Sequence, residues 1–243
     1  MLKKLWTIGL LAALAGTAYG QGSIFGFKGG PTIGLQQWES FERDPLFRYH
    51  GILFVESLPE DNSYALFAQI GYNPKGSAIR SRNAFGISGD IFRLPTQAFI
   101  FHNASLTVGA KQKFKKSGAE GRTYYMFGLR LDYTFDTNLD EYEEVNQSYP
   151  IYPINDKQLI REINYGLALG GGIEFPFSEF VGGMLEFTVN PDFSLQYQQP
   201  KAEVYVNNSF YMGNLSIPER NIRNLTFELT LGLRFLRKVI YVD

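Results

Sequence analysis

The chain has 243 residues with 16% aromatic and only 19% charged residues, which excludes a disordered chain. Its net charge of −1 excludes a strongly basic nucleic-acid-binding protein. The absence of cysteine excludes a disulfide scaffold, a thiolate metal site and a cysteine nucleophile, and two histidines leave little for a histidine-rich metal site.

The first twenty residues have the order of a secretory signal peptide. Two lysines near the start are followed by a short apolar run at 5–15, and Ala18 and Gly20 are the small residues that a signal peptidase reads. We therefore expect a signal peptide at 1–20 and one domain at 21–243. A membrane anchor is the alternative, but the run is shorter than the roughly 20 apolar residues that span a bilayer. No later run is long enough for a transmembrane helix.

The rest of the chain alternates between apolar and polar residues with a period of two, which is typical of β-strands. In the clearest segment, Phe227, Leu229 and Leu231 share one face while Glu228 and Thr230 share the other. Eight strands are predicted in this way: 24–35, 47–56, 64–72, 99–113, 125–135, 165–175, 180–193 and 227–235.

The connections between these strands are expected to alternate strictly between short and long. Short ones lie at 57–62, 115–121 and 176–179, and long ones at 36–46, 73–98, 136–163 and 194–222. Outer-membrane barrels have short turns on one side, longer loops on the other and an even strand count. The pattern predicts an all-β fold: an eight-stranded antiparallel up-and-down transmembrane β-barrel with a filled lumen.

The two faces of the strands differ in chemistry. One face is almost purely apolar and suits lipid, whereas a soluble, lipocalin-like barrel needs a polar exterior. We expect the polar face to carry a lumen charge network of four cations and four anions: Lys28, Lys111, Arg130, Arg234, Asp132, Glu174, Glu186 and Glu228. Unpaired charges in so narrow a space are costly, so these groups should pair with one another.

Aromatic residues gather near the predicted strand ends, where membrane barrels carry interfacial girdles. The residues expected there are Phe47, Tyr49, Tyr72, Phe99, Tyr124, Tyr125, Phe135, Phe175 and Phe235. Together with the signal peptide and the loop alternation, they favour the membrane barrel over the soluble one.

Several segments resemble the PorT-like family of small outer-membrane barrels. They are the first strand at 25–35, the stretch at 65–76, and the later strands at 125–133 and 229–235. The resemblance implies a bacterial outer-membrane barrel, and the name-giving member of that family is linked to type IX protein secretion. It supplies no catalytic residue.

Catalytic and metal-binding patterns are weak. His50 lies in a predicted strand near Glu56 and Ser57, and His102 falls on the lipid side by alternation, so a structural or interfacial role is favoured over a catalytic triad. The stretch from Asp136 starts like an EF-hand but has Glu141 where glycine is required. Residues 170–172 lack the lysine and helix of a phosphate loop. We expect no metal and no cofactor.

The predicted outer loops differ in charge. The second long loop carries the basic residues Lys75, Arg80, Arg82 and Arg93, and the third carries the acidic residues Asp140, Glu141, Glu143 and Glu144. These sets are candidates for pairing with each other, or for binding a partner, with the basic loop contacting lipopolysaccharide phosphates. The expected partners are outer-membrane lipid, lipopolysaccharide and other envelope or secretion proteins, but not nucleic acid.

The function expected from these patterns is a non-enzymatic outer-membrane barrel that acts as a scaffold or through its surface loops. The alternatives are a narrow channel and a lipid-modifying enzyme.

Overall fold

The computed structural model describes most of the chain beyond its first 21 residues. The described residues are 22–38, 43–58, 63–80, 83–85, 90–93, 96–115, 121–148, 152–207 and 212–237. The predicted signal peptide lies outside them and stays a prediction.

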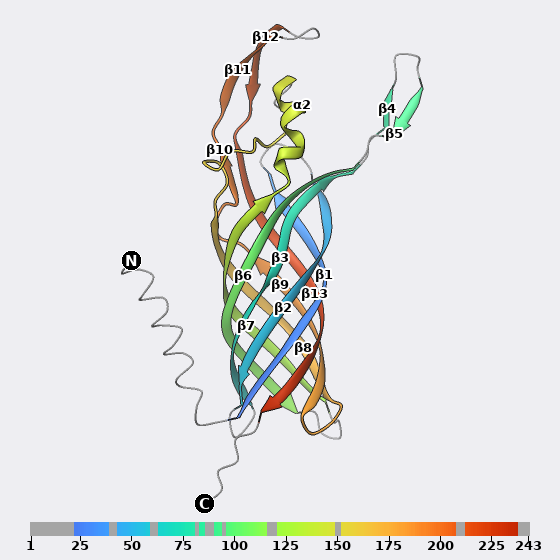
Figure 1. Ribbon diagram of the computed structural model, residues 1–243, viewed down its shortest axis with the longest axis vertical. Helices are drawn as coiled ribbons and strands as arrows, with labels where there is room; N and C mark the ends of the chain where they lie inside the picture. The colour runs from blue at the N-terminus through green and yellow to red at the C-terminus, as the bar shows by residue number, and fades with distance from the viewer. Residues whose placement is uncertain are drawn as a thin grey trace, which may run out of the picture.

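Eight long strands close into a ring in which each strand runs antiparallel to its neighbours. They are β1 (Ser23–Gln37), β2 (Asp44–Ser57), β3 (Tyr64–Ile79), β6 (Gln97–Lys115), β7 (Arg122–Thr137), β8 (Ile163–Pro176), β9 (Val181–Pro191) and β13 (Arg220–Arg237). The ring closes where β1 pairs with β13, from Ser23 opposite Arg237 to Gln37 opposite Arg223. Figure 1 shows the tilted strands of this barrel. The predicted up-and-down eight-stranded barrel is confirmed.

The remaining elements lie at one end of the barrel, opposite the start of β1 and the end of β13, and we call it the loop end (Figure 1). They comprise a hairpin of β4 (Asn83–Phe85) and β5 (Ile91–Arg93), the 3-10 helix η1 (Leu139–Tyr142), the short helix α2 (Glu143–Ser148), β10 (Tyr197–Gln199), and a hairpin of β11 (Ala202–Asn207) and β12 (Met212–Ile217). We call the opposite side the terminus end. Among the described residues, no helix has the length and apolar character needed to cross a membrane.

The outer wall is an apolar belt. On β7, six successive outward side chains are between 46% and 60% exposed: Tyr125, Phe127, Leu129, Leu131, Tyr133 and Phe135. Ten residue steps of about 3.3 Å, tilted by about 40°, give this belt a height of about 25 Å, which is the height of the lipid-facing band of membrane barrels. Apolar surface of this extent is not stable in water, so the fold is a transmembrane barrel and the soluble alternative is excluded.

The inward side chains of β7 are chemically opposite to its outward ones. Arg130, Asp132 and Thr134 are at most 5% exposed, although they are polar or charged. The alternation of the sequence therefore sorts the side chains as predicted, with lipid outside and a filled polar interior.

The predicted strand ends were wrong at β3, which continues seven residues beyond Tyr72. The added residues include Pro74, which has no backbone N–H to donate. However, the β2–β3 ladder is interrupted between Pro45 and Gly51, so the neighbouring part of β3 has no partner on that side and tolerates a proline.

The first connection is another correction. Since β1 and β2 are both longer than predicted, they are joined by residues 38–43 only, as many as the 58–63 that join β2 to β3. Strict alternation of short and long connections is therefore wrong at this position.

Two of the expected girdle aromatics also lie elsewhere. Phe99 is fully buried and Tyr124 is 4% exposed, because both occupy inward positions of their strands. Phe47, Tyr49, Tyr72, Tyr125 and Phe135 do lie on the exposed outer wall.

Candidate functional site

The lumen holds a network of buried charges. Among the described residues, six cations and six anions form eleven ion pairs inside the barrel. All eight predicted lumen charges belong to it, and four more join them: Glu56, Lys75, Lys113 and Asp192. Each strand of the ring contributes at least one member.

The first part of this network, the terminus-end cluster, contains Lys28, Lys111, Lys113, Arg234, Glu56, Glu174 and Glu186. Lys111 Nζ lies 3.0 Å from Glu56 Oε2, and Lys113 Nζ lies 3.2 Å from Glu174 Oε2. Lys28 pairs with Glu186, Lys113 also with Glu56, and Arg234 with Glu174. The carboxylates are therefore shared between cations, which satisfies charges that a low-dielectric interior would otherwise expel.

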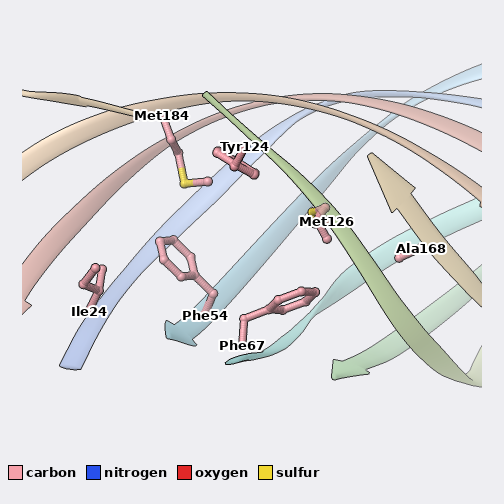
Figure 2. Packing of buried hydrophobic residues seen from close by; sticks show 7 residues of the cluster. All are labelled: Ile24, Phe54, Phe67, Tyr124, Met126, Ala168 and Met184. Carbon is pink, nitrogen blue, oxygen red and sulfur yellow. The ribbon is translucent and has the colours of Figure 1, made fainter. Parts of the chain in front are cut away.

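Apolar side chains pack around this cluster. Figure 2 shows Phe54, Phe67, Tyr124, Met126 and Met184 pointing into the same part of the lumen. The Lys111 ammonium lies 4.5 Å from the centre of the Tyr124 ring, a cation–π distance. Tyr124 also donates a hydrogen bond of 2.7 Å to Glu186, so this tyrosine holds a cation and an anion in place.

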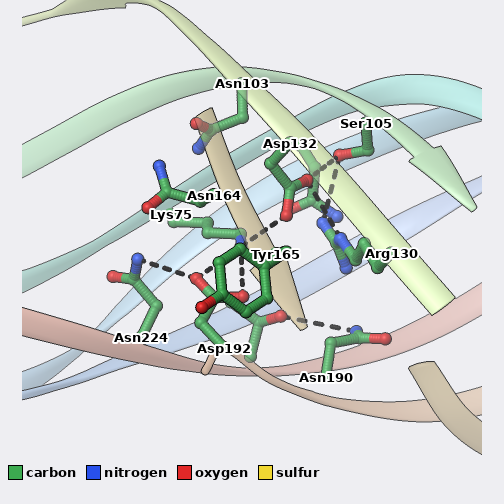
Figure 3. Close-up of polar contacts among 12 residues, drawn as sticks. Lys75, Asn103, Ser105, Arg130, Asp132, Asn164, Tyr165, Asn190, Asp192 and Asn224 are labelled. Carbon is green, nitrogen blue, oxygen red and sulfur yellow. Dashed lines mark hydrogen bonds and ion pairs between the residues drawn. The ribbon is translucent and has the colours of Figure 1, made fainter. Parts of the chain in front are cut away.

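The second part of the network, the loop-end cluster, contains Lys75, Arg130, Asp132, Asp192 and Glu228. Figure 3 shows the first four of these residues. Lys75 is fully buried and bridges Asp132 at 2.8 Å and Asp192 at 2.6 Å. Arg130 bridges Asp132 and Glu228, both at 3.0 Å.

Neutral groups complete the loop-end cluster. Ser105 donates to Asp132 at 2.5 Å, and Asn224 donates to Asp192 at 3.1 Å. The carboxylates thus keep more partners than the cations alone supply, and the cluster is held rigidly.

The position of Lys75 corrects a prediction. It was expected on an outer loop as a binding residue, but the extension of β3 carries it into the lumen, on the same face as Asn73 and Ser77.

The two histidines lie on opposite faces of the barrel wall. His50 is buried in the lumen, with Nδ1 2.8 Å from Thr32 Oγ1 and Nε2 3.0 Å from Thr230 Oγ1. His102 lies on the outer face, where its Nδ1 is 2.6 Å from the Tyr72 hydroxyl. Among the described residues neither imidazole contacts a carboxylate, so the arrangement offers no Ser-His-acid constellation. The described residues also contain no group of His, Asp and Glu that fits a metal ion.

An apolar cap lies across the loop end of the lumen. It consists of Phe99, Phe101, Leu139, Tyr142, Tyr197 and Ile222, which are at most 8% exposed. Along β6 the inward positions change from Phe99 and Phe101 to polar residues and then to Lys111, so the cap is stacked directly on the charge network.

Polar contacts fix the segments that build the cap. The Tyr142 hydroxyl donates to the Ala98 carbonyl at 2.8 Å, and Asn138 bonds both Ala98 and Ile100. Burial raises the pKa of Tyr197 to about 12, although the Ile154 N–H, which donates a hydrogen bond of 2.9 Å to its hydroxyl, opposes the rise.

Arg43 covers one side of the cap, with its guanidinium 3.9 Å from the centre of the Trp38 ring. Burial, together with the nearby Arg220, lowers the pKa of Arg43 to about 10. The cap is therefore a packed assembly of loop segments and not an open vestibule.

The predicted loop-binding residues are only partly brought together. Asp140, Glu141, Glu143 and Glu144 lie exposed on η1 and α2, while Leu139 and Tyr142 of the same turns are buried in the cap. Arg80 is exposed; its backbone N–H donates to Asp44 and its guanidinium lies 5.0 Å from the centre of the Phe47 ring. Arg82 and the side chain of Arg93 lie outside what the structure describes. No ion pair links the described members of the two sets.

Three of the four missed lumen charges had a usable signal in the predicted strands. Glu56 and Lys113 are the last residues of predicted strands, and each lies an even number of residues from inward positions of its strand. Asp192 likewise follows Glu186 at an even spacing. Lys75 was missed because the strand was ended too early.

The barrel and its interior together define a small membrane-spanning β-barrel whose lumen is filled by ion pairs and closed at the loop end. No protein-family model matches the sequence, and no curated protein matches it.

Solved structures with a similar architecture are outer-membrane proteins. OprG from Pseudomonas aeruginosa has a TM-score of 0.49 and 11% identity, covering 89% of this chain and 96% of that chain. A major outer membrane protein from Thermus thermophilus has a TM-score of 0.48 and 13% identity, covering 88% and 99%. Neisserial surface protein A has a TM-score of 0.47 and 10% identity, covering 88% and 96%. These likenesses are too distant to carry an argument about what this chain does.

Proposed function

We propose that this protein is a non-enzymatic, non-conducting barrel of the bacterial outer membrane that presents its loop end to a partner. The observation that carries the proposal is the closed lumen: ion pairs fill it and the apolar cap lies on top. What extends beyond the membrane is an ordered set of loop elements, and recognition in membrane barrels is concentrated in such loops.

The β11–β12 hairpin is the most prominent surface available for a partner. It projects beyond the barrel in Figure 1, and among the described strands β11 and β12 pair only with each other. Tyr205 is 62% exposed and Met212 is 72% exposed. A two-stranded ribbon is only marginally stable in water, so its apolar side chains and free strand edges favour contact with another protein.

A narrow channel is the alternative that can be tested first. We expect the purified barrel in planar lipid bilayers to show no steady conductance at 100 mV in about 1 M KCl. Heat-modifiable gel mobility of the same sample shows that the barrel is folded. Steady, ohmic steps from folded protein would contradict the proposal.

Loop-end contact is tested by site-specific photo-crosslinking in the native envelope. A photoreactive residue in place of Tyr205 should give a discrete protein adduct. The matched control is a photoreactive residue in place of Tyr165, which is also a tyrosine but is 53% exposed on the lipid-facing wall. This control should give no protein adduct. Adducts from neither position, or equally from both, would contradict a role for the hairpin.

The resemblance to PorT-like barrels supports a setting in a secretion apparatus of the type IX kind. Mass spectrometry of the Tyr205 adduct tests it: a secretion or envelope component is expected. A lipid-modifying enzyme is the less supported alternative, since the hydrogen-bond partners of His50 within the described ranges are Thr32 and Thr230. A His50→Gln variant that lost acyltransfer to lipid A would favour it.

A further inference from the structure

A cavity of about 320 Å³ lies beside the outer ends of β1 and β13, apart from the lumen network. Its walls are Gln37, Trp38, Leu195, Asn221 and Arg223. Gln37 and Arg223 are register partners across the β1–β13 pair, and residue 195 belongs to the segment that follows β9. The cavity is therefore built by three parts of the chain that the closed barrel holds together.

The height of the cavity relative to the belt limits its ligand. On β1, Gln37 is the outward position that follows Leu35, and on β13, Arg223 is the outward position beyond Leu225. Two residues along a tilted strand correspond to about 5 Å of height. The cavity thus lies just beyond the apolar belt, at the level where lipid headgroups meet water.

Two polar groups in the cavity wall have no partner among the described residues. Asn221 donates its amide to Glu219 at 2.7 Å, but its Oδ1 atom is buried without a hydrogen-bond donor. Arg223 is exposed, and no ion pair joins its guanidinium to a carboxylate of the described residues. A buried acceptor that stays unpaired is costly, so a ligand that donates a hydroxyl here is favoured.

The chemistry of the whole set fits one class of molecule. Gln37 and Asn221 offer amide groups that suit hydroxyls, Trp38 offers an aromatic surface for C–H groups, and Arg223 offers a fork for an anionic oxygen. We propose that this cavity binds a sugar that carries a phosphate, either as a free glycan or as the headgroup of a lipid.

Trp38 makes the proposal directly measurable, because Trp6 is the only other tryptophan of the chain. In a Trp6→Phe background, Trp38 is the one fluorescent tryptophan, and it lines the cavity while its ring also contacts Arg43 and Phe99. We expect saturable titration with glucose 1-phosphate in detergent, at least tenfold weaker titration with glucose, and none with inorganic phosphate. The proposal would be overturned if Trp38 fluorescence responded neither to glucose 1-phosphate in detergent nor to lipopolysaccharide in vesicles.

Variants separate the two parts of the site. Arg223→Gln should weaken glucose 1-phosphate at least tenfold and leave glucose unchanged, since the charged contact serves the phosphate. Asn221→Leu should weaken both ligands about tenfold. Arg237→Gln removes an exposed arginine from the terminus end and is the matched control. Each variant must keep heat-modifiable mobility, and a control variant that behaved like Arg223→Gln would overturn the assignment.

The two sources of the sugar are distinguished in vesicles. The Trp38 fluorescence of the protein is compared between vesicles that contain lipopolysaccharide and vesicles of phosphatidylglycerol. If the ligand is a lipid headgroup, the fluorescence should differ between the two, and glucose 1-phosphate should reverse the difference. Titration by the soluble sugar phosphate with no response to lipopolysaccharide assigns the site to a free glycan.

Discussion

Removal of the Lys75 ammonium is the most direct test of the closed lumen. The group lies between two buried carboxylates, 2.8 Å from Asp132 and 2.6 Å from Asp192. At an effective dielectric constant of about 20, unit charges 2.7 Å apart attract by roughly 6 kcal/mol before desolvation is counted. Loss of one partner of a buried pair costs about 3–5 kcal/mol, because an uncompensated charge remains. We expect Lys75→Met to lower the free energy of unfolding by that amount.

The assay is urea unfolding in detergent, followed by the gel-mobility shift between folded and unfolded barrel. Lys201→Met makes the same substitution at an exposed loop position and should change stability by less than about 0.5 kcal/mol. The double variant Lys75→Met with Asp192→Asn should recover part of the loss, since it removes one of the stranded anions. A Lys75→Met variant within about 1 kcal/mol of the unchanged protein would show that water reaches the cluster, which refutes the closed lumen.

Three further predictions concern the loop end. Phe99→Ala, which empties a fully buried position of the cap, should lower the free energy of unfolding by about 3–5 kcal/mol in the same urea assay, and an unchanged midpoint would contradict a packed cap. The raised pKa of Tyr197, about 12 against an ordinary value of 10, means that the cap is stabilised below pH 10 and loses on the order of 2–3 kcal/mol as the pH rises to 12. Limited proteolysis should therefore cut the loops faster from pH 10 to 12, and Tyr197→Phe should remove part of this pH dependence. Gly76→Ala should destabilise the barrel by about 1–3 kcal/mol, because φ is +156° and a Cβ would lie 2.0 Å from the Phe99 carbonyl oxygen. The assay is thermal unfolding monitored by gel mobility, and equal unfolding temperatures for the variant and the unchanged protein would contradict the prediction.

The sequence was sufficient for the fold because the lipid and the lumen impose a period of two on every strand. On β7 from Tyr125 to Phe135, every outward side chain is apolar and exposed, whereas the inward positions are buried and hold Arg130, Asp132 and Thr134 together with Met126 and Gly128. A one-residue slip would exchange the two faces, so the pattern also specifies the register.

The alternation failed where local breakers or loops change the rule. The strand predicted to end at Tyr72 continues through Pro74, which is tolerated because the β2–β3 ladder is interrupted there, and Lys75 was misplaced as a result. At the outer end of β6 the inward residues Phe99 and Phe101 are apolar, because there the lumen is filled by loop segments. Which loop segment returns to the mouth depends on contacts far apart in sequence, such as Tyr142 with Ala98, and no local pattern contains them.

The charges of the lumen also explain why it is filled throughout. The ion-paired groups of the terminus-end cluster are four cations and three anions, whereas those of the loop-end cluster are two cations and three anions. Each cluster alone would leave one buried charge uncompensated, but the two excesses have opposite sign and lie in the same narrow lumen. Since an isolated buried charge is far more costly than a pair, the clusters stabilise each other, and His50 with its two threonines supplies a polar contact to the wall beside them. A water-filled pore would relieve this requirement, so near-neutral pairing along the barrel is the arrangement expected of a sealed interior.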